Sequence, residues 1–185
     1  MKRYLYPALL CSFLISNLNA YDNYIKTAIL YTTPSDLEST SSIGVKDTVE
    51  MKSGYALEGA IGQRLSDDFS IEAQYSYDKA NVKGNNSNIK VHSLFLNGIY
   101  NISIDSSSMH PYIGIGVGVA SYGDGTTDDT VLAYQGFTGL SFDTDYNIET
   151  YVEYKYKDFV NVSLDDISYD NTSIHAVGVG IKSKF

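Results

Sequence analysis

The sequence has one cysteine, no tryptophan and three prolines among its 185 residues. With Cys11 as the only cysteine, a disulfide framework is excluded, and Leu10 stands where a lipoprotein acylation site requires a small residue. After residue 20 no run of 18 or more apolar residues occurs, which excludes a helical membrane protein. Basic residues are also scarce, with 13 Lys and Arg against 22 Asp and Glu. This balance argues against a nucleic-acid partner, because phosphate binding needs clustered basic side chains.

The first twenty residues have the pattern of a targeting segment. A basic start is followed by an apolar stretch over residues 4–15 and by a small residue, Ala20. The apolar stretch is too short to span a bilayer as a helix. The pattern predicts a cleaved Sec-type signal peptide over residues 1–20 and a single domain over residues 21–185.

The rest of the chain alternates between apolar and polar residues with a period of two. It divides into eight segments of about ten residues, the length that a tilted strand needs to cross a membrane. The predicted strands are residues 23–32, 53–64, 68–78, 90–102, 111–122, 131–142, 146–157 and 173–185. Seventeen tyrosines in a chain of many short alternating segments point to a β-barrel.

The links between the predicted strands tend to alternate in length. The short or moderate ones are residues 65–67, 103–110 and 143–145. The others are mostly longer and rich in Ser, Asn, Asp and Gly, and they are residues 33–52, 79–89, 123–130 and 158–172. Links 103–110 and 123–130 are equal in length, so the contrast fails there. The pattern is typical of transmembrane barrels, with short periplasmic turns and long outer loops.

Periodicity alone does not decide which face of these strands points into the barrel. In the fifth strand, Ile113, Ile115, Val117 and Val119 share one face, and Gly114, Gly116, Gly118 and Ala120 share the other. In the last strand, one face has His175, Val177, Val179, Ile181, Ser183 and Phe185, and the other has Ala176, Gly178, Gly180, Lys182 and Lys184. Glycine-rich faces suit a narrow lumen filled by neighbouring side chains, so we expect the polar face inside.

An internal repeat supports the strand assignment. Residues 56–77 match residues 133–154 with a shift of 77 positions and no gap. The shared residues are Ala56, Gly59, Gly62, Asp68, Ile71, Glu72 and Tyr77, which recur as Ala133, Gly136, Gly139, Asp145, Ile148, Glu149 and Tyr154. The repeat predicts one hairpin used twice, with the same strand register and turn position.

At this level of pattern the chain resembles a known family. The segments HPYIGIGVGVA, GLSFDTDYNIETYVEYKYKDF and HAVGVGIKSKF resemble the small outer-membrane barrels of the OmpA, OmpX and opacity-protein type. The resemblance implies an all-β fold, an eight-stranded antiparallel up-and-down transmembrane β-barrel in the bacterial outer membrane. Its partners would be outer-membrane lipid, lipopolysaccharide and the barrel-assembly machinery, which would recognise Phe185 and the apolar residues at alternate positions before it. Ser183 departs from that alternation.

Charged side chains should fill the lumen of such a barrel. The residues predicted to point inward are Glu58, Arg64, Glu72, Glu149, Glu153 and Lys155. An ion or proton path is the functional alternative. An eight-stranded barrel is only wide enough for side chains, so we expect these charges to pair and close the lumen.

The sequence offers no persuasive catalytic, cofactor or metal site. His92, His110 and His175 lack a serine and a carboxylate at a spacing typical of lipid A modifying enzymes, and we expect interface or turn histidines. Acidic loop residues could hold Ca²⁺ but have no EF-hand spacing, so solvated charges are expected; they are Asp124, Asp128, Asp129, Asp165, Asp166 and Asp170. The tyrosines expected in aromatic girdles are Tyr24, Tyr55, Tyr75, Tyr77, Tyr100, Tyr134, Tyr146, Tyr154 and Tyr156.

Three functions remain open at this stage. The first is a structural or surface-interaction protein, not an enzyme, that binds a surface or host ligand through its outer loops. The second is a lipid A modifying enzyme of the outer membrane. The third is a soluble periplasmic β-barrel that binds a small apolar ligand, in which the apolar face would point inward.

Overall fold

The computed structural model describes residues 23–35, 37–40, 46–49, 51–81, 88–104, 108–123, 128–144, 147–160, 162–164, 167–170 and 173–185. The expected leader, residues 1–20, lies outside these ranges. The strands are β1 (Asn23–Pro34), β2 (Leu37–Thr40), β3 (Lys46–Val49), β4 (Gly54–Arg64), β5 (Phe69–Asn81), β6 (Asn88–Asn101), β7 (Met109–Gly123), β8 (Asp128–Asp143), β9 (Ile148–Val160), β10 (Val162–Leu164), β11 (Ile167–Asp170) and β12 (Ser173–Lys184). No helix in the described part of the chain is long and apolar enough to cross a membrane.

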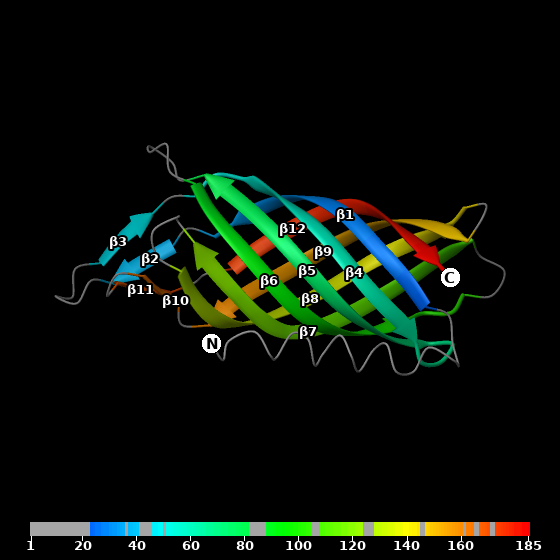
Figure 1. Cartoon of the computed structure of the whole chain (residues 1–185). Coiled ribbons are helices and arrows are strands. Elements are labelled where there is room, and N and C mark those ends of the chain that lie inside the picture. Colours follow the sequence, from blue (N-terminus) through cyan, green and yellow to red (C-terminus); the bar gives the residue numbers. More distant parts are fainter. Residues whose placement is uncertain are drawn as a thin grey trace.

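Eight antiparallel strands close into a barrel (Figure 1). Their order is β1-β12-β9-β8-β7-β6-β5-β4, and β1 closes the barrel by pairing with both β4 and β12. All eight predicted strands are present, with ends that differ by at most three residues from the expected ones. The prediction of an eight-stranded up-and-down barrel is therefore confirmed.

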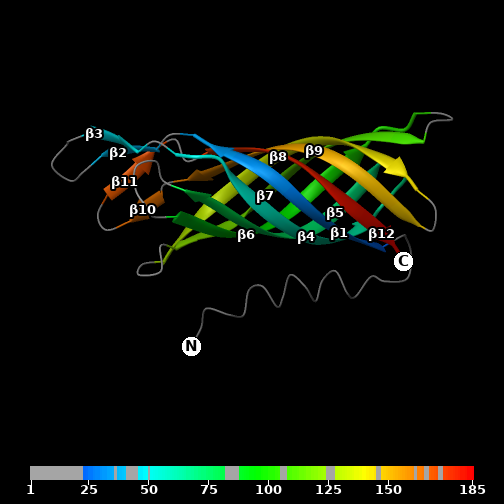
Figure 2. The same cartoon turned by 90° about the horizontal axis from the view of Figure 1, so that it is seen from above.

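Two of the expected loops form a second sheet. Strands β2 and β3 come from the expected loop 33–52, and β10 and β11 come from the expected loop 158–172. They pair in the order β10-β11-β2-β3, and the β2–β11 pairing joins the first loop to the last. In Figures 1 and 2 this loop sheet lies beyond one end of the barrel, opposite the end where β12 finishes. These strands are three or four residues long, so an alternation of apolar and polar residues is too short to be recognised in the sequence.

The polar face points into the barrel, as expected. Outward side chains are predominantly apolar, and three of the most exposed are Ile115, Val117 and Leu132, at 73%, 66% and 66%. Inward side chains include Glu72, Lys155 and Lys157, which are almost completely buried. A soluble barrel with an apolar interior is the reverse arrangement, so that alternative is wrong.

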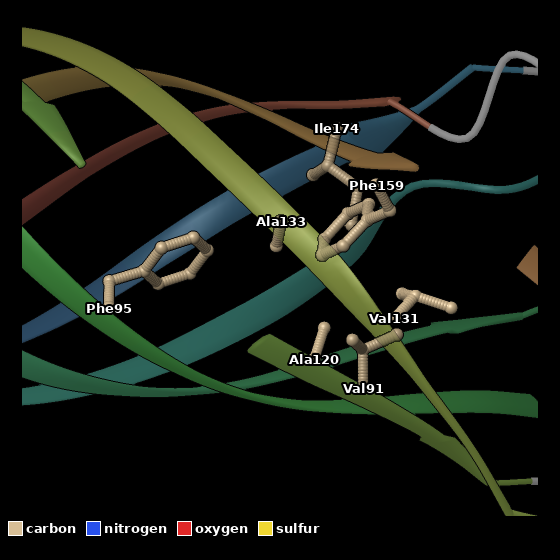
Figure 3. Close-up of a cluster of buried hydrophobic side chains, with 7 residues drawn as sticks. All are labelled: Val91, Phe95, Ala120, Val131, Ala133, Phe159 and Ile174. Atoms are coloured by element: carbon tan, nitrogen blue, oxygen red, sulfur yellow. The ribbon is translucent and has the colours of Figure 1, made fainter. Parts of the chain in front are cut away.

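An apolar cluster fills the lumen near the loop sheet (Figure 3). It comprises Val91, Phe95, Ala120, Val131, Ala133, Phe159 and Ile174, contributed by five strands. The labelled side chains converge on the barrel interior from β6, β7, β8, β9 and β12. The cluster closes this end of the barrel, while the middle of the lumen is charged.

The internal repeat keeps its faces but not its register. Gly62 and Gly139 both point inward, and Gly59 and Gly136 both point outward, as the repeat predicts. However, Gly62 pairs with Glu72 across β4–β5, whereas Gly139 pairs with Glu153, not with the repeat partner Glu149. The second hairpin is thus shifted by four residues, and the prediction of an identical register is wrong.

Candidate functional site

A chain of alternating charges occupies the middle of the lumen. Its ion pairs are Lys26–Glu72 (3.4 Å), Lys26–Glu153 (3.5 Å), Lys155–Glu153 (3.1 Å), Lys155–Glu58 (2.7 Å), Lys157–Glu58 (3.0 Å) and Lys157–Asp78 (3.0 Å). Each ammonium group lies between two carboxylates, so no like charges are adjacent along the chain. Buried charges are tolerated when each is paired and hydrogen-bonded in this way.

The register shift explains the position of Lys26. Glu72 and Glu153 each lie across a strand pair from a glycine, and Lys26 bridges the two carboxylates. Tyr24 covers Gly62 and donates to Glu72, while Tyr112 covers Gly139 and donates to Glu153. A Cβ at either glycine would overlap the tyrosine ring. The two hairpins therefore supply matching halves of one lysine site.

Tyr24 was expected in an aromatic girdle, and this expectation is wrong. Its side chain points into the lumen and is buried, because β1 places Tyr24 on the same face as Lys26. Tyr146 lies outside the described residues, and the other expected girdle tyrosines point outward. Five of them are exposed: Tyr55, Tyr75, Tyr100, Tyr134 and Tyr154. Tyr77 and Tyr156 are half-buried on the same outward face.

A layer of amides packs against the charge chain. Asn97 donates to Glu72 (3.1 Å) and Gln74 (2.9 Å), and Gln135 donates to Gln74 (3.1 Å) and Asn97 (2.7 Å). A Cβ at Gly116 would lie 2.0 Å from the Asn97 amide oxygen, so the glycine face of β7 makes room for this layer. The gap beside Lys26 and Gln74 is small, at about 10 Å³. Such a gap is about the size of one water molecule.

The predicted lumen residues fall into two groups. Glu58, Glu72, Glu153 and Lys155 belong to the charge chain, whereas Glu149 pairs with Lys182 and Lys184 near the end of the barrel opposite the loop sheet. Arg64 lines a cavity of about 190 Å³ at that same mouth.

Sequence reasoning missed Lys26, Asp78 and Lys157 as members of the network. All three have the alternation of the inward face, and Asp78 and Lys157 are the last residues of their predicted strands. Alternation alone could have assigned them, because each lies an even number of residues from an inward neighbour.

The histidines do not form a catalytic triad. His110 lies at the barrel mouth with Nε2 2.8 Å from Asp143, but the nearby Ser141 hydroxyl donates to the His110 backbone carbonyl. His92 and His175 point outward, and each ring nitrogen Nδ1 meets a tyrosine hydroxyl. Among the described residues, no serine hydroxyl bonds a histidine ring, and no cluster of His, Cys, Asp or Glu could hold a metal ion.

The expected acidic loop clusters lie partly outside the described residues. Asp124, Asp165 and Asp166 lie outside the described residues. Asp128 and Asp129 begin β8, and Asp170 ends β11.

Comparison with known proteins identifies the family. A family model described as "Surface antigen" matches residues 84–183, more than half of the chain. The chain belongs to the surface antigen family. No curated protein matches it.

Solved outer-membrane barrels share the fold of this surface antigen. Neisserial surface protein A (NspA) is 20% identical, with a TM-score of 0.65 over 88% of this chain and 97% of its own. The outer membrane protein OprG from Pseudomonas aeruginosa is 17% identical, with a TM-score of 0.65 over 88% and 96% of the two chains. The outer membrane protein AlkL is 15% identical, with a TM-score of 0.57 over 89% of this chain and 90% of its own. Together with the outward apolar face, the family and fold establish an integral outer-membrane β-barrel.

The filled lumen predicts that this barrel does not conduct ions steadily. The apolar cluster and the paired charges occupy the described lumen, so we expect no continuous wide path along it. We expect purified protein in planar bilayers to show no stepwise conductance, measured beside a large general porin as the positive control. Reproducible ohmic steps from the folded protein would contradict the closed lumen.

Proposed function

We propose that this surface antigen is an interaction protein whose binding surface is the loop sheet, with the barrel as its anchor. The supporting observation is the β2–β11 pairing, in which Ser39 lies opposite Tyr169 and the first loop is joined to the last. Loops tied together in this way form a preorganised surface, which lowers the entropy cost of binding. The partner we propose is a protein on the surface of another cell.

An open edge of the loop sheet favours a protein partner. Strand β3 pairs only with β2 among the described residues, so its other edge has no further strand, whereas β10 at the other side of the loop sheet lies beside β8 of the barrel. Open strand edges present backbone N–H and C=O groups that an extended segment of another protein can pair with. The open edge of β3 is four residues long, which suits a short recognition segment.

Removing the β2–β3 hairpin should abolish binding and leave the barrel intact. We expect Gram-negative cells that display a variant with residues 37–49 replaced by a short Gly-Ser link to lose adherence to cultured cells. A matched control replaces residues 65–67, the turn at the opposite end, with a link of the same composition. Heat-modifiable migration on gels reports barrel folding for both variants. Undiminished adherence of a folded hairpin variant would refute the proposal.

We infer that the protein is not a lipid A modifying enzyme. The inference is supported by Ser141, whose hydroxyl points to a backbone carbonyl, and by the tyrosine partners of His92 and His175. Nucleophilic catalysis needs the serine within hydrogen-bond reach of its base. Unaltered lipid A in a strain that overproduces the protein would agree with this inference.

Export and assembly complete the proposal. Residues 1–20 act as the cleaved signal peptide, and the barrel-assembly machinery recognises Phe185. In support, Phe185 is 67% exposed and continues the outward apolar row of Val177, Val179 and Ile181. The outward face as a whole contacts outer-membrane lipid and lipopolysaccharide.

A further inference from the structure

Two lysines face each other on the outward side of β5 and β6. Lys79 and Lys90 are directly opposed across the strand pair, close to the outer end where β5 finishes and β6 begins (Figure 1). Like charges in this position destabilise a sheet. Neither lysine makes an ion pair with a residue in the described part of the chain. Within the described ranges the pair therefore consists of two positive charges side by side without a counter-charge.

A histidine in contact with two tyrosines, His92, lies two residues further along β6, toward the middle of the strand. His92 is directly opposite Tyr77, with ring centroids 5.0 Å apart. The hydroxyl of Tyr75 lies 2.7 Å from Nδ1 of His92 and fixes the ring. This leaves Nε2 as the ring nitrogen available to a ligand. His92 and Lys90 are two residues apart on one face of β6, so they can contact the same group.

The height of these residues matches the outer headgroups of the membrane. At the opposite end of the same strands, Phe69 pairs with Tyr100 on the outward face. Eight residues separate Phe69 from Tyr77, roughly 27 Å along the strand at the usual rise. With the usual tilt this is roughly 20 Å across the membrane, close to the height of the apolar band of such barrels. Lys79 and Lys90 lie just beyond that band.

On the opposite side of the barrel, a second histidine contacts two tyrosines, but no lysine pair lies next to it on the outward face among the described residues. His175 pairs with Tyr156, with ring centroids 5.1 Å apart, and its Nδ1 lies 2.8 Å from the Tyr154 hydroxyl. In the next outward position stands Asp158, which accepts hydrogen bonds from Tyr134 (2.5 Å) and Tyr156 (3.2 Å). One cluster is therefore cationic and the other is acidic with its carboxylate already satisfied.

We propose that Lys79, Lys90 and His92 form a binding site for a phosphate group of the outer-leaflet glycolipid, lipopolysaccharide. A phosphate between the two ammonium groups converts their repulsion into two charge-assisted contacts. The position at the headgroup level selects a lipid phosphate over a free one, because the acyl chains then lie against the apolar wall below. The site depends on the outer-membrane location and not on the loop sheet, so loss of lipid binding would leave the proposed adhesion unaffected.

The test uses the folded full barrel in detergent micelles with three probes: lipopolysaccharide, the same lipopolysaccharide after chemical removal of its phosphates, and inorganic phosphate. We expect the double variant K79Q/K90Q to bind intact lipopolysaccharide at least about tenfold more weakly, as expected for losing contacts to a charged group. The matched control is H175Q in the acidic cluster, which should bind like the wild type. Heat-modifiable migration checks that each variant is folded.

A second measurement separates binding from folding effects. In zwitterionic vesicles K90Q should unfold at a higher denaturant concentration than the wild type, because the repulsion is removed; with lipopolysaccharide present the order should reverse. In the wild type, the ¹⁵N NMR signal of His92 should shift on addition of intact lipopolysaccharide only. Equal binding by wild type and K79Q/K90Q, equal binding of the dephosphorylated lipid, or equivalent binding of inorganic phosphate would each overturn the proposal.

Discussion

Replacement of Lys155 by methionine lowers the free energy of unfolding by about 3–5 kcal/mol, the usual cost of breaking a buried ion pair. Lys155 is 1% exposed and lies between Glu58 (2.7 Å) and Glu153 (3.1 Å), with Gln74 as a further acceptor at 3.2 Å. Methionine fills a similar volume without a charge. The variant therefore leaves Lys26 as the one ammonium partner of Glu153 and Lys157 as that of Glu58 among the described residues, with both carboxylates buried.

Denaturant titration of the barrel in phosphocholine vesicles, followed by far-ultraviolet circular dichroism, gives this free energy by linear extrapolation. Lys52→Met is the matched control, because Lys52 is exposed; its effect should stay within about 0.5 kcal/mol. In the double variant K155M/E58Q, the loss should be smaller than the sum of the two single losses, because the second substitution removes a carboxylate that the first left short of a partner. A loss below about 1 kcal/mol for Lys155→Met would contradict a network that stabilises the lumen.

Alternation along the chain was sufficient to predict the strands of the barrel and the residues that share each face. A strand with one apolar and one polar face leaves two possible orientations, and the glycines of β7 selected between them. Gly114, Gly116 and Gly118 do lie against Phe137, Asn97 and Phe95, respectively, so their face had to be the crowded one. The inward position of Glu153 and Lys155 then followed from the alternation of β9.

Cross-strand register could not be predicted in the same way. It depends on turn length and on how side chains pack in the lumen, neither of which has a period in the sequence. The repeat placed Glu149 as the counterpart of Glu72, but the four-residue shift gives that place to Glu153 and brings Lys26 between the two glutamates. The inward position of Tyr24 belongs to the same lysine site.

The outward cationic cluster was missed because of strand boundaries. The third predicted strand ended at residue 78, so Lys79 was assigned to a loop. His92 shares the outward face of β6 with Leu94. The register of β5 and β6 is needed to see that Tyr77 lies opposite His92. The same register places Lys79 opposite Lys90, two residues further along each strand.

A second large effect is expected from a charge placed at the middle of the outward face. Ile115 is the seventh residue of the fifteen in β7, and its side chain is 73% exposed. The two residues directly opposite it are Gly98 and Gly136, so neither opposed position has a side chain that could shield a new group. In a bilayer Ile115→Arg should lower the free energy of unfolding by about 2–4 kcal/mol, as for arginine at the midplane of other barrels. In water the same substitution at an exposed site would cost almost nothing.

The depth dependence of this effect tests the membrane orientation directly. Ile102 follows β6 at the end of the barrel opposite the loop sheet and is 43% exposed, so Ile102→Arg should cost only about 0–1 kcal/mol at the interface. Both variants are measured by denaturant titration in vesicles and again in detergent micelles, where the penalty at residue 115 should shrink because water and headgroups reach the arginine. Equal costs at the two positions in vesicles would mean that residue 115 does not lie in the hydrocarbon core. The unequal costs that we expect follow from one physical cause, since an arginine at the centre of β7 loses hydration that an arginine at the end of β6 retains.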